Sequence, residues 1–536
     1  MTDLPPSRDT LPLGLGLRAW LGVLAAVTLV RLLVAATYPV YETEAYYWLW
    51  SRHLAAGYFD HPPMLGWLCW LTDWWGAPHG LAVRTHTVLS HFVASVLTFY
   101  LGRNLLGSNR LGVLSALIYN AIPFLSAIAV QNQPDSPLLV FWVATVVCLE
   151  RALKTERRWW WILAGVCAGG AFLSKFHGFV FVGFILLYLL ASKQDRRWAR
   201  TPWPYLALLT GLLVYSPNIV WNARNEWLTY DFQFLRHGRE SHLNIGYPVL
   251  TLGAPLIYLS PWVFVLTLAV WRGIYKSGDW IRVRERALLF WITAPLYLFF
   301  VLMSLRQQIK FHWAAPAFAV VCPLLAAEID RWTPRRRAWF LASAAAFSVI
   351  VYAYLELSPL TRLIVPPSWL PPVAHYVPGH QKEKDWTNHA LGWPEFGAHL
   401  RKEVERSGAT APTFILAQRF DRAAVAGFYA EMPERAWVLN PGKDHYLERG
   451  DPDPRGFMAW ENGLVAEGSN AIYVFYERES RSWKRERYML LRCFREIDPI
   501  ELEEYEVVRG GKVVRRFYYV RCTYFLPDAP VVLKDE

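Results

Sequence analysis

The sequence predicts a mainly α-helical integral membrane protein of about 11 transmembrane helices, followed by a small C-terminal α/β domain. Hydrophobic residues make up 54% of the 536 residues, and charged residues only 18%. Up to about Leu357 the apolar residues form runs long enough to cross a bilayer, and beyond Leu357 these runs stop. Residues 358–536 hold 25 Lys and Arg against 26 Asp and Glu and are nearly neutral, so the preceding part, with 30 basic and 18 acidic residues, carries a balance of +12.

The first predicted span covers roughly Leu17 to Tyr38, and we interpret it as an uncleaved anchor because it is too long for a signal-peptide core. Further spans are expected to start near Thr85, Leu111, Leu138, Trp159, Gly178, Pro204, Pro248, Ala287, His312 and Ala338. A single helix over Trp159–Ser192 would reach about 51 Å, far beyond the ~30 Å hydrocarbon core of a bilayer. We therefore predict two spans that meet at Lys175, with Lys175 in a water-exposed turn.

Basic residues collect in alternate loops of this arrangement. They are Arg103 and Arg110; Arg151, Lys154, Arg157 and Arg158; Lys193, Arg196, Arg197 and Arg200; Arg272, Lys276, Arg282, Arg284 and Arg286; and Arg331, Arg335, Arg336 and Arg337. The positive-inside rule makes this side cytoplasmic. The other loops and the C-terminal domain are therefore expected outside the cytoplasm. Because the charge is explained as a topology signal, we expect membrane lipids and no nucleic acid as partners.

Three regions follow from these patterns. Residues 1–357 form the transmembrane domain, whose large first extracytoplasmic loop is 40–83, residues 358–384 form a proline-rich linker, and 385–536 form the soluble domain. Helical patterns at 393–407 and 422–429 alternate with strand-like runs at 413–418 and 471–476, and residues 504–508 and 513–525 resemble a hairpin. The six cysteines include no Cys-x-x-Cys pair, and a disulfide between Cys493 and Cys522 is left open.

The loops predicted to face outward hold both carboxylates and cations. The candidate catalytic carboxylates are Glu44, Asp60 and Asp135, and the candidate phosphate-binding residues are His61, Lys175, Lys310 and His312. Such a set suits sugar transfer from a lipid phosphate, since a carboxylate can act as general base on the acceptor hydroxyl and cations can stabilise the leaving phosphate. Simpler alternatives are that Glu42 and Glu44 solvate the loop, or that Asp135 is a helix N-cap.

The same residues lie in motifs that resemble the GT-C-fold glycosyltransferases, in the branch related to protein O-mannosyltransferases and lipid A aminoarabinose transferases. The motifs are Glu44-Ala-Tyr-Tyr-Trp, Tyr58-Phe-Asp-His-Pro-Pro, Pro134-Asp-Ser-Pro-Leu, Leu173-Ser-Lys and Pro217-Asn-Ile-Val-Trp-Asn. The resemblance extends from the first span to about Leu357. It implies a GT-C-type membrane enzyme that moves a sugar from a polyprenyl-phosphate donor to a lipid, glycan or protein acceptor outside the cytoplasm.

The resemblance also implies roles for individual residues. Glu44 matches the Glu of the family's first-loop Asp-Glu pair, Asp60 the acid before the next basic-Pro-Pro element, and Asp135 the second-loop acid. His61 falls where relatives often have a lysine that contacts the donor phosphate, and Lys175 matches the basic residue after Leu-Ser.

One position departs from the family pattern. Thr43 stands where the family has the first-loop Asp that is often taken as the catalytic base. A threonine cannot act as a general base near neutral pH, so Glu42, Glu44 or Asp60 has to take this role, and we favour Glu44 or Asp60. No cofactor is firmly implied. A divalent metal is possible because Asp60, His61 and Glu44 offer oxygen and nitrogen ligands, although their spacing matches no dedicated metal motif.

Two other classes of function remain as alternatives. A multi-pass transporter or flippase is favoured by Arg31, a charge inside the first span. A catalytically inactive scaffold that binds lipid-linked sugars is favoured by Thr43.

Overall fold

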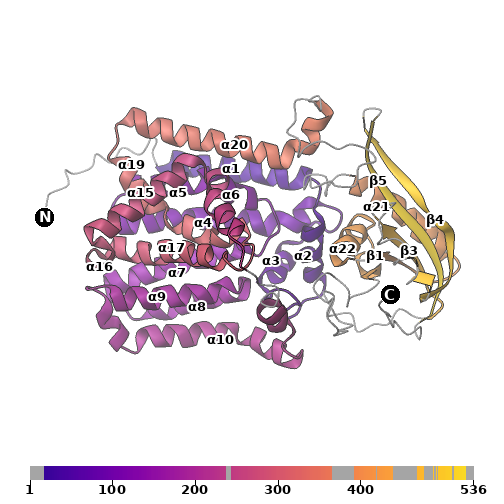
Figure 1. Ribbon diagram of the computed structural model, residues 1–536, viewed down its shortest axis with the longest axis horizontal. Coiled ribbons are helices and arrows are strands. Elements are labelled where there is room, and N and C mark those ends of the chain that lie inside the picture. Colours follow the sequence, from indigo (N-terminus) through magenta and orange to yellow (C-terminus); the bar gives the residue numbers. More distant parts are fainter. Residues whose placement is uncertain are drawn as a thin grey trace. The chain divides into compact units, whose positions relative to one another are not determined.

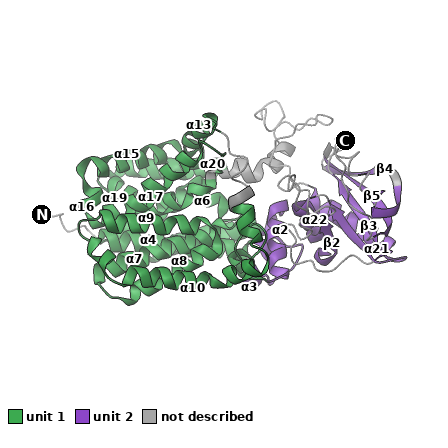
Figure 2. Ribbon diagram, turned by 60° about the horizontal axis from the view of Figure 1, so that its bottom comes forward, with its two compact units in different colours: residues 1–35, 55–68, 84–354 green, residues 36–54, 69–83, 355–536 purple. Residues whose placement is uncertain are grey.

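The chain folds into two compact units, shown in different colours in Figure 2. The computed structural model describes residues 17–236, 243–364, 392–417, 419–438, 467–475, 487, 490–491, 493–509 and 512–526. Unit 1 comprises residues 1–35, 55–68 and 84–354, and unit 2 comprises residues 36–54, 69–83 and 355–536. The first loop, residues 40–83, therefore contributes to both units. Most of the predicted proline-rich linker lies outside the described residues.

Unit 1 is a bundle of helices, many of which run side by side (Figure 1). Its helices are α1 (Leu17–Thr37), α3 (Met64–Thr72), α4 (Gly80–Leu106), α5 (Asn109–Ala121), α6 (Pro123–Ile128), α7 (Asp135–Thr155), α8 (Trp159–Ser174), α9 (His177–Ala191), α10 (Trp203–Arg224), α13 (Gly246–Gly253), α14 (Pro255–Tyr258), α15 (Pro261–Ser277), α16 (Asp279–Arg282), α17 (Arg284–Met303), α18 (Ala315–Val320), α19 (Cys322–Asp330) and α20 (Pro334–Ile364). The ends of α1, α3, α4 and α20 extend beyond the residues assigned to unit 1.

Four helices in the described part of the chain are long and apolar enough to cross a membrane, namely α1, α7, α10 and α17. Two bent pairs raise this number to six if each pair is one span: residues 246–258 with α15, bent by 115°, and residues 312–320 with α19, bent by 46°. Pro261 and Pro323 stand in the first turn of the second helix of each pair. Proline explains the breaks because it lacks the amide hydrogen that would continue the preceding helix. The total of about 11 spans stays a prediction.

Small residues allow α8 and α10 to pack closely. A Cβ atom on Gly165 would lie 2.3 Å from the carbonyl oxygen of Ala207, and one on Gly169 would lie 2.5 Å from Cβ of Val214. Close approach over glycine is a common way for helices to associate where apolar burial gives no driving force between them. This contact fixes α8, whose C-terminal end carries Lys175.

The predicted break after α8 is confirmed. Helix α8 ends at Ser174, Lys175 adopts an extended backbone, and α9 begins at His177. The prediction that Lys175 sits in a water-exposed turn is wrong. Only 4% of this residue is exposed, because its side chain is held by a carboxylate from another helix.

Unit 2 contains a five-stranded mixed sheet of order β2-β1-β3-β5-β4. The strands are β1 (Thr413–Ala417), β2 (Ala436–Val438), β3 (Asn470–Phe475), β4 (Phe494–Arg509) and β5 (Lys512–Phe525). Strand β1 runs parallel to β2 and β3, whereas β5 is antiparallel to both β3 and β4. The predicted α/β domain, and the pairing of its last two strands, are therefore confirmed.

Among the described residues of unit 2, the helices α2 (Glu42–Arg52), α21 (Trp393–Gly408) and α22 (Phe420–Tyr429) accompany the sheet. The aromatic residues of α2 pack against α22. The ring centroid of Tyr46 lies 4.5 Å from that of Phe420, and the centroid of Trp48 lies 5.0 Å from that of Phe428. The Glu42–Arg52 segment is thus part of the core of unit 2 and does not form a polar loop.

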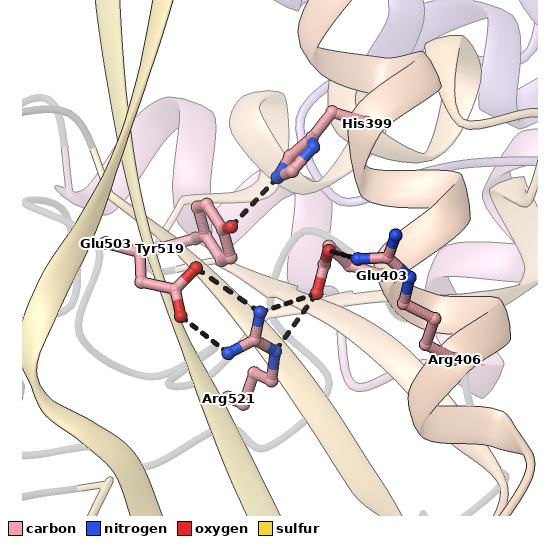
Figure 3. Close-up of polar contacts among 6 residues, drawn as sticks. All are labelled: His399, Glu403, Arg406, Glu503, Tyr519 and Arg521. Atoms are coloured by element: carbon pink, nitrogen blue, oxygen red, sulfur yellow. Dashed lines mark hydrogen bonds and ion pairs between the residues drawn. The ribbon is translucent and has the colours of Figure 1, made fainter.

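A charged network joins α21 to β4 and β5 (Figure 3). Arg521 on β5 donates hydrogen bonds to Glu403 on α21 at 2.8 Å and to Glu503 on β4 at 2.5 Å. Arg406 adds a second bond to Glu403 at 2.9 Å. Glu403 is only 2% exposed, so its charge is buried but compensated from two sides.

Cys493 and Cys522 in this unit are both free thiols.

A candidate active site in the helical unit

Asp135 and Lys175 form a buried ion pair in unit 1. Both carboxylate oxygens of Asp135 accept hydrogen bonds from the Lys175 ammonium, at 3.0 and 2.9 Å. The two side chains are 3% and 5% exposed. The interpretation of Asp135 as an N-cap is wrong, since the N-cap of α7 is Pro134. Asp135 instead lies in the first turn of α7, where the helix dipole also favours a negative charge.

Three histidines and a second lysine act electrostatically on this pair or on one another. His61 precedes α3, His177 opens α9, and Lys310 with His312 belongs to the segment around a short 3-10 helix, Phe311–Ala314. His61 is influenced by the charges of Lys175, Asp135, Lys310 and His312. His177 is influenced by the same pair and by both other histidines. The structure therefore places five predicted site residues within electrostatic range of one another, a group that we call the cluster: His61, Asp135, Lys175, Lys310 and His312.

His177 is a member of this cluster that sequence reasoning did not select. Its ring packs against Trp313, with centroids 5.0 Å apart, and against Phe300 at 5.4 Å. Its buried Nδ1 atom has no hydrogen-bond partner among the described residues. The available signal was its position two residues after Lys175, at the start of an otherwise apolar helix.

The protonation state of His61 follows from its surroundings. Burial is the largest effect and, with the positive charge of Lys175, lowers the pKa of His61 to about 3, while Asp135 acts in the opposite direction. His61 is therefore neutral at physiological pH. An anion bound nearby would favour the protonated imidazole, so His61 can respond to a phosphate group by taking up a proton. Lys310, which is exposed, supplies a further positive charge.

The loop that carries Asp60 and His61 is held by α10 and the segment after it. The Asn218 side chain donates to the carbonyl of Ala56 at 2.9 Å, and Thr229 Oγ1 donates to the carbonyl of Tyr58 at 2.8 Å. The Gln233 side-chain amide donates to the Asp60 carbonyl at 2.5 Å. We call these three hydrogen bonds the loop clamp.

Gly57 is needed for this close approach. A Cβ atom at this position would lie 2.5 Å from Cε3 of Trp221 and 2.6 Å from Nδ2 of Asn218. Asn222 supports the clamp from behind, since its side chain donates to the Asn218 carbonyl at 3.0 Å and accepts from the Thr229 amide at 3.2 Å. The motif at residues 217–222, to which sequence reasoning gave no role, therefore positions the loop. Asp60 itself is buried, with 8% exposure.

The acidic residues of the other half of the first loop belong to unit 2. Glu44 is 1% exposed, and its Oε2 accepts a hydrogen bond from the Tyr41 amide at 3.0 Å, so it caps the start of α2. Glu42 is 6% exposed and lies 3.8 Å from the guanidinium of Arg515. The alternative that these two acids only solvate a loop is therefore wrong. Thr43, between them, is exposed.

A metal centre finds no support in the described part of the chain. Among those residues no group of three or more His, Cys, Asp or Glu side chains is arranged to hold a metal ion. The Asp135 carboxylate already forms an ion pair with the Lys175 ammonium, which supplies the positive charge beside it.

Comparison with solved structures places the chain in a class, that of the GT-C-fold membrane proteins. Solved structures share this fold. ArnT from Cupriavidus metallidurans bound to undecaprenyl phosphate has a TM-score of 0.62 at 18% identity and covers 94% of this chain and 98% of its own. The archaeal oligosaccharyltransferase AglB from Archaeoglobus fulgidus has a TM-score of 0.50 at 12% identity and covers 96% and 75%.

Individual relatives agree with this class. Residues 60–221 match the family described as dolichyl-phosphate-mannose-protein mannosyltransferase. The undecaprenyl phosphate-alpha-4-amino-4-deoxy-L-arabinose arabinosyl transferase of Edwardsiella ictaluri is 26% identical over 307 residues, which is 53% of this chain and 52% of the relative. The lipid A galacturonosyltransferase RgtD of Rhizobium johnstonii is 26% identical over 279 residues, covering 51% and 57%. The chain thus matches about half the length of these relatives. It is a GT-C-fold membrane protein related to lipid A aminoarabinose transferases and O-mannosyltransferases, which confirms the resemblance of its motifs.

Proposed function

We propose that this protein transfers a sugar from a polyprenyl-phosphate donor to a lipid acceptor at the outer face of a bacterial inner membrane. The observation that carries the proposal is the Asp135–Lys175 pair with its surrounding histidines and Lys310. A site of this kind can bind an anionic phosphate beside apolar helices. The names of the relatives support an undecaprenyl-phosphate sugar as donor and lipid A as acceptor.

The proposed reaction is a displacement at the anomeric carbon of the donor. The acceptor hydroxyl oxygen forms a bond to this carbon while the bond from the carbon to the phosphate oxygen breaks. The polyprenyl phosphate leaves with the bonding electron pair, and its negative charge is stabilised by Lys175, Lys310 and His61. Charge stabilisation of this type is commonly the largest contribution to catalysis. The hydroxyl proton passes to a carboxylate.

Asp60 is the carboxylate that we assign as general base. Glu42 and Glu44 belong to unit 2, whereas Asp60 belongs to the same unit as Lys175 and Lys310. Asp135 already serves as the counter-charge of Lys175. Asp60 is buried on the clamped loop, next to His61. A general base of this kind has to be positioned within hydrogen-bond reach of the acceptor hydroxyl, and the clamp supplies the required rigidity.

The orientation in the membrane is part of the proposal. Basic loops on one side favour a cytoplasmic location for that side and an extracytoplasmic location for unit 2. Lys402→Cys, an exposed position on α21, should react with a membrane-impermeant maleimide in intact spheroplasts, whereas Arg335→Cys should react only after lysis. The opposite pattern would reverse the orientation. Both experiments need a background without Cys493 and Cys522.

The reaction is tested with purified protein and a panel of labelled polyprenyl-phosphate sugars, with and without lipid A. Wild type should transfer sugar, Asp60→Asn should lose this activity, and Glu328→Gln, a surface carboxylate on α19, should retain it. Donor binding without turnover in the wild type would instead identify the inactive scaffold. Neither binding nor turnover would favour a transporter.

A further inference from the structure

A pocket opens near the C-terminal end of α7, roughly 25 Å along the helix from Asp135. Its volume is about 300 Å³. It lies between the turn that connects α4 to α5 and the last turns of α7, and its cationic lining residues are Arg103, Arg151 and Lys154. The lining contains no carboxylate. A pocket lined by three basic side chains and no acidic one favours the binding of an anion.

Its basic side chains are oriented by neighbouring groups. Lys154 Nζ donates to the carbonyl of Asn104 at 2.5 Å and lies 3.8 Å from the carboxylate of Glu150, which is buried behind the lining. The guanidinium of Arg151 lies 5.9 Å from the ring centroid of Trp160. The Glu150 carboxylate lies beside only one of the three basic side chains at ion-pair distance, so Arg103 and Arg151 remain as positive charges of the lining.

The start of α5 adds to the same electrostatic field. Ser108 is the N-cap of this 13-residue helix, and its hydroxyl accepts a hydrogen bond from the Arg110 amide at 3.2 Å. Ser108 and Asn109 both line the pocket. The positive end of the helix dipole therefore points at the space that the basic side chains surround.

Basic loops of a membrane protein also serve as topology signals, so the pocket has to be compared with the other basic loops. Several of their arginines lie within ion-pair distance of an acid, such as Arg284 with Asp195 and Arg197 with Glu156. Arg103 and Arg151 form no ion pair within the described residues, and the same holds there for Arg158 and Arg200 of other loops. The feature that distinguishes Arg103 and Arg151 is that both line one pocket.

Two exposed aromatic residues lie near the arginines that line the pocket, Tyr100 on α4 and Trp159 at the start of α8. Tyr100 precedes Arg103 by about one turn of α4 and is 44% exposed. Trp159 is 50% exposed and stacks on Trp160 with ring centroids 3.8 Å apart. Exposed Trp and Tyr side chains are typical of the interface between headgroups and acyl chains, which places the pocket at headgroup depth.

We propose that this pocket binds a phosphate group presented by an anionic phospholipid of the surrounding leaflet. Basic pockets between transmembrane helices are known sites for anionic headgroups. The phosphate would accept hydrogen bonds from Arg103 and Arg151, and the acyl chains would lie along Tyr100 and Trp159. The site is separate from the sugar-transfer cluster and does not depend on the proposed reaction.

The test is native mass spectrometry of the purified full chain titrated with phosphatidylglycerol, phosphatidylcholine or inorganic phosphate. The variant Arg103→Gln/Arg151→Gln removes two charges from the pocket. Since each basic side chain near a headgroup contributes a factor of about five in affinity, this variant should bind phosphatidylglycerol about 25-fold more weakly. Arg103→Lys/Arg151→Lys keeps the charges and should bind within about threefold of wild type.

A matched control removes two charges elsewhere on the same predicted side. Arg272→Gln/Lys276→Gln changes exposed residues in the last two turns of α15 and should leave binding unchanged. Equal losses in both Gln pairs, or no loss in either, would overturn the proposal. Tighter binding of phosphatidylglycerol than of phosphatidylcholine by the wild type supports the proposal. Binding of inorganic phosphate without a preference for phosphatidylglycerol would show that the ligand is a free phosphate and would overturn the proposal of a lipid. Thermal unfolding of each variant confirms that the chains compared are folded.

Discussion

The buried ion pair between Asp135 and Lys175 leads to the sharpest prediction. Asp135→Asn leaves the Lys175 ammonium in an environment where its side chain is 5% exposed, without a counter-charge. Removing one partner of a buried pair costs about 3–5 kcal/mol, because the remaining charge is uncompensated. Lys175→Gln has the same consequence for Asp135. The double variant Asp135→Asn/Lys175→Gln buries no net charge and should be more stable than either single variant.

Activity should follow a different order from stability. If the Lys175 charge stabilises the leaving phosphate, Lys175→Gln and the double variant, which both lack this charge, lose about 100- to 1,000-fold in kcat. Asp135→Asn keeps the ammonium and should lose less activity than either. Restoring stability in the double variant therefore leaves turnover low. The assays are thermal unfolding followed by tryptophan fluorescence, and sugar transfer from a polyprenyl-phosphate donor at a temperature where every variant is folded.

A second buried pair of unit 1 provides the control. Asp195 is fully buried and is held by Arg284 at 2.8 Å, and it also accepts a hydrogen bond from the Tyr188 hydroxyl at 2.6 Å. Asp195→Asn should lower the unfolding temperature and leave kcat of the folded protein within about threefold of wild type. Turnover of the double variant within tenfold of wild type would refute the reasoning, since the pair would then serve the fold alone.

Three further predictions concern other contacts. The pKa of His61 is lowered to about 3 in the folded protein, whereas a histidine in the unfolded chain has a pKa of about 6.5. Below pH 6.5 the unfolded chain therefore binds the extra proton, and the free energy of unfolding should fall by up to about 1.4 kcal/mol per pH unit. His61→Asn should flatten this dependence in acid unfolding curves. Gly57→Ala forces a Cβ atom to 2.5 Å from the Trp221 ring and should reduce sugar transfer more than tenfold, whereas Gly183→Ala, with open space at its Cβ position, should have no effect in the same assay. Glu403→Gln should lower the free energy of unfolding by about 2 kcal/mol, because Arg521 and Arg406 each lose a charge-assisted hydrogen bond to Glu403. An equal loss for Glu405→Gln, at an exposed position, would contradict this.

Much of the fold could be predicted because it depends on patterns that are local in sequence. Apolar runs, the break at Lys175 and the hairpin at residues 504–508 and 513–525 each follow from composition and period, whereas the first half of β4, residues 494–503, was not predicted. The burial of Lys175 could not be predicted in this way, since it depends on Asp135, 40 residues away, and on the packing of α7 against α8. The residues next to Lys175 in the sequence are mostly apolar, and a charge among apolar residues is most simply accommodated by exposing it to water in a turn.

The site was predicted in part for the same reason. Motifs identified Asp60, His61 and Asp135, but the clamp formed by Asn218 and Thr229 consists of side-chain bonds to backbone carbonyls, which no residue pattern at the accepting end reveals. Every residue has a backbone carbonyl that can accept a hydrogen bond, so the sequence of the loop does not indicate which side chains hold it.

The exchange of the family's first-loop acid for Thr43 can be understood from the roles of its neighbours. Glu42 and Glu44 are buried and engaged within unit 2, and they flank an exposed Thr43 in the first turn of α2. An acid at position 43 would add a third carboxylate to this turn, and the helix dipole would stabilise its ionised form. Among the described residues, Asp60 is the only acid of the first loop that belongs to unit 1, and it is next to His61, a phosphate-binding candidate. If Asp60 is the base, Thr43→Asp should leave sugar transfer by the Asp60→Asn variant near its low level. Recovery of transfer in Thr43→Asp/Asp60→Asn to more than a tenth of wild type would show instead that the first turn of α2 contributes to the site and that the family's base can be restored there.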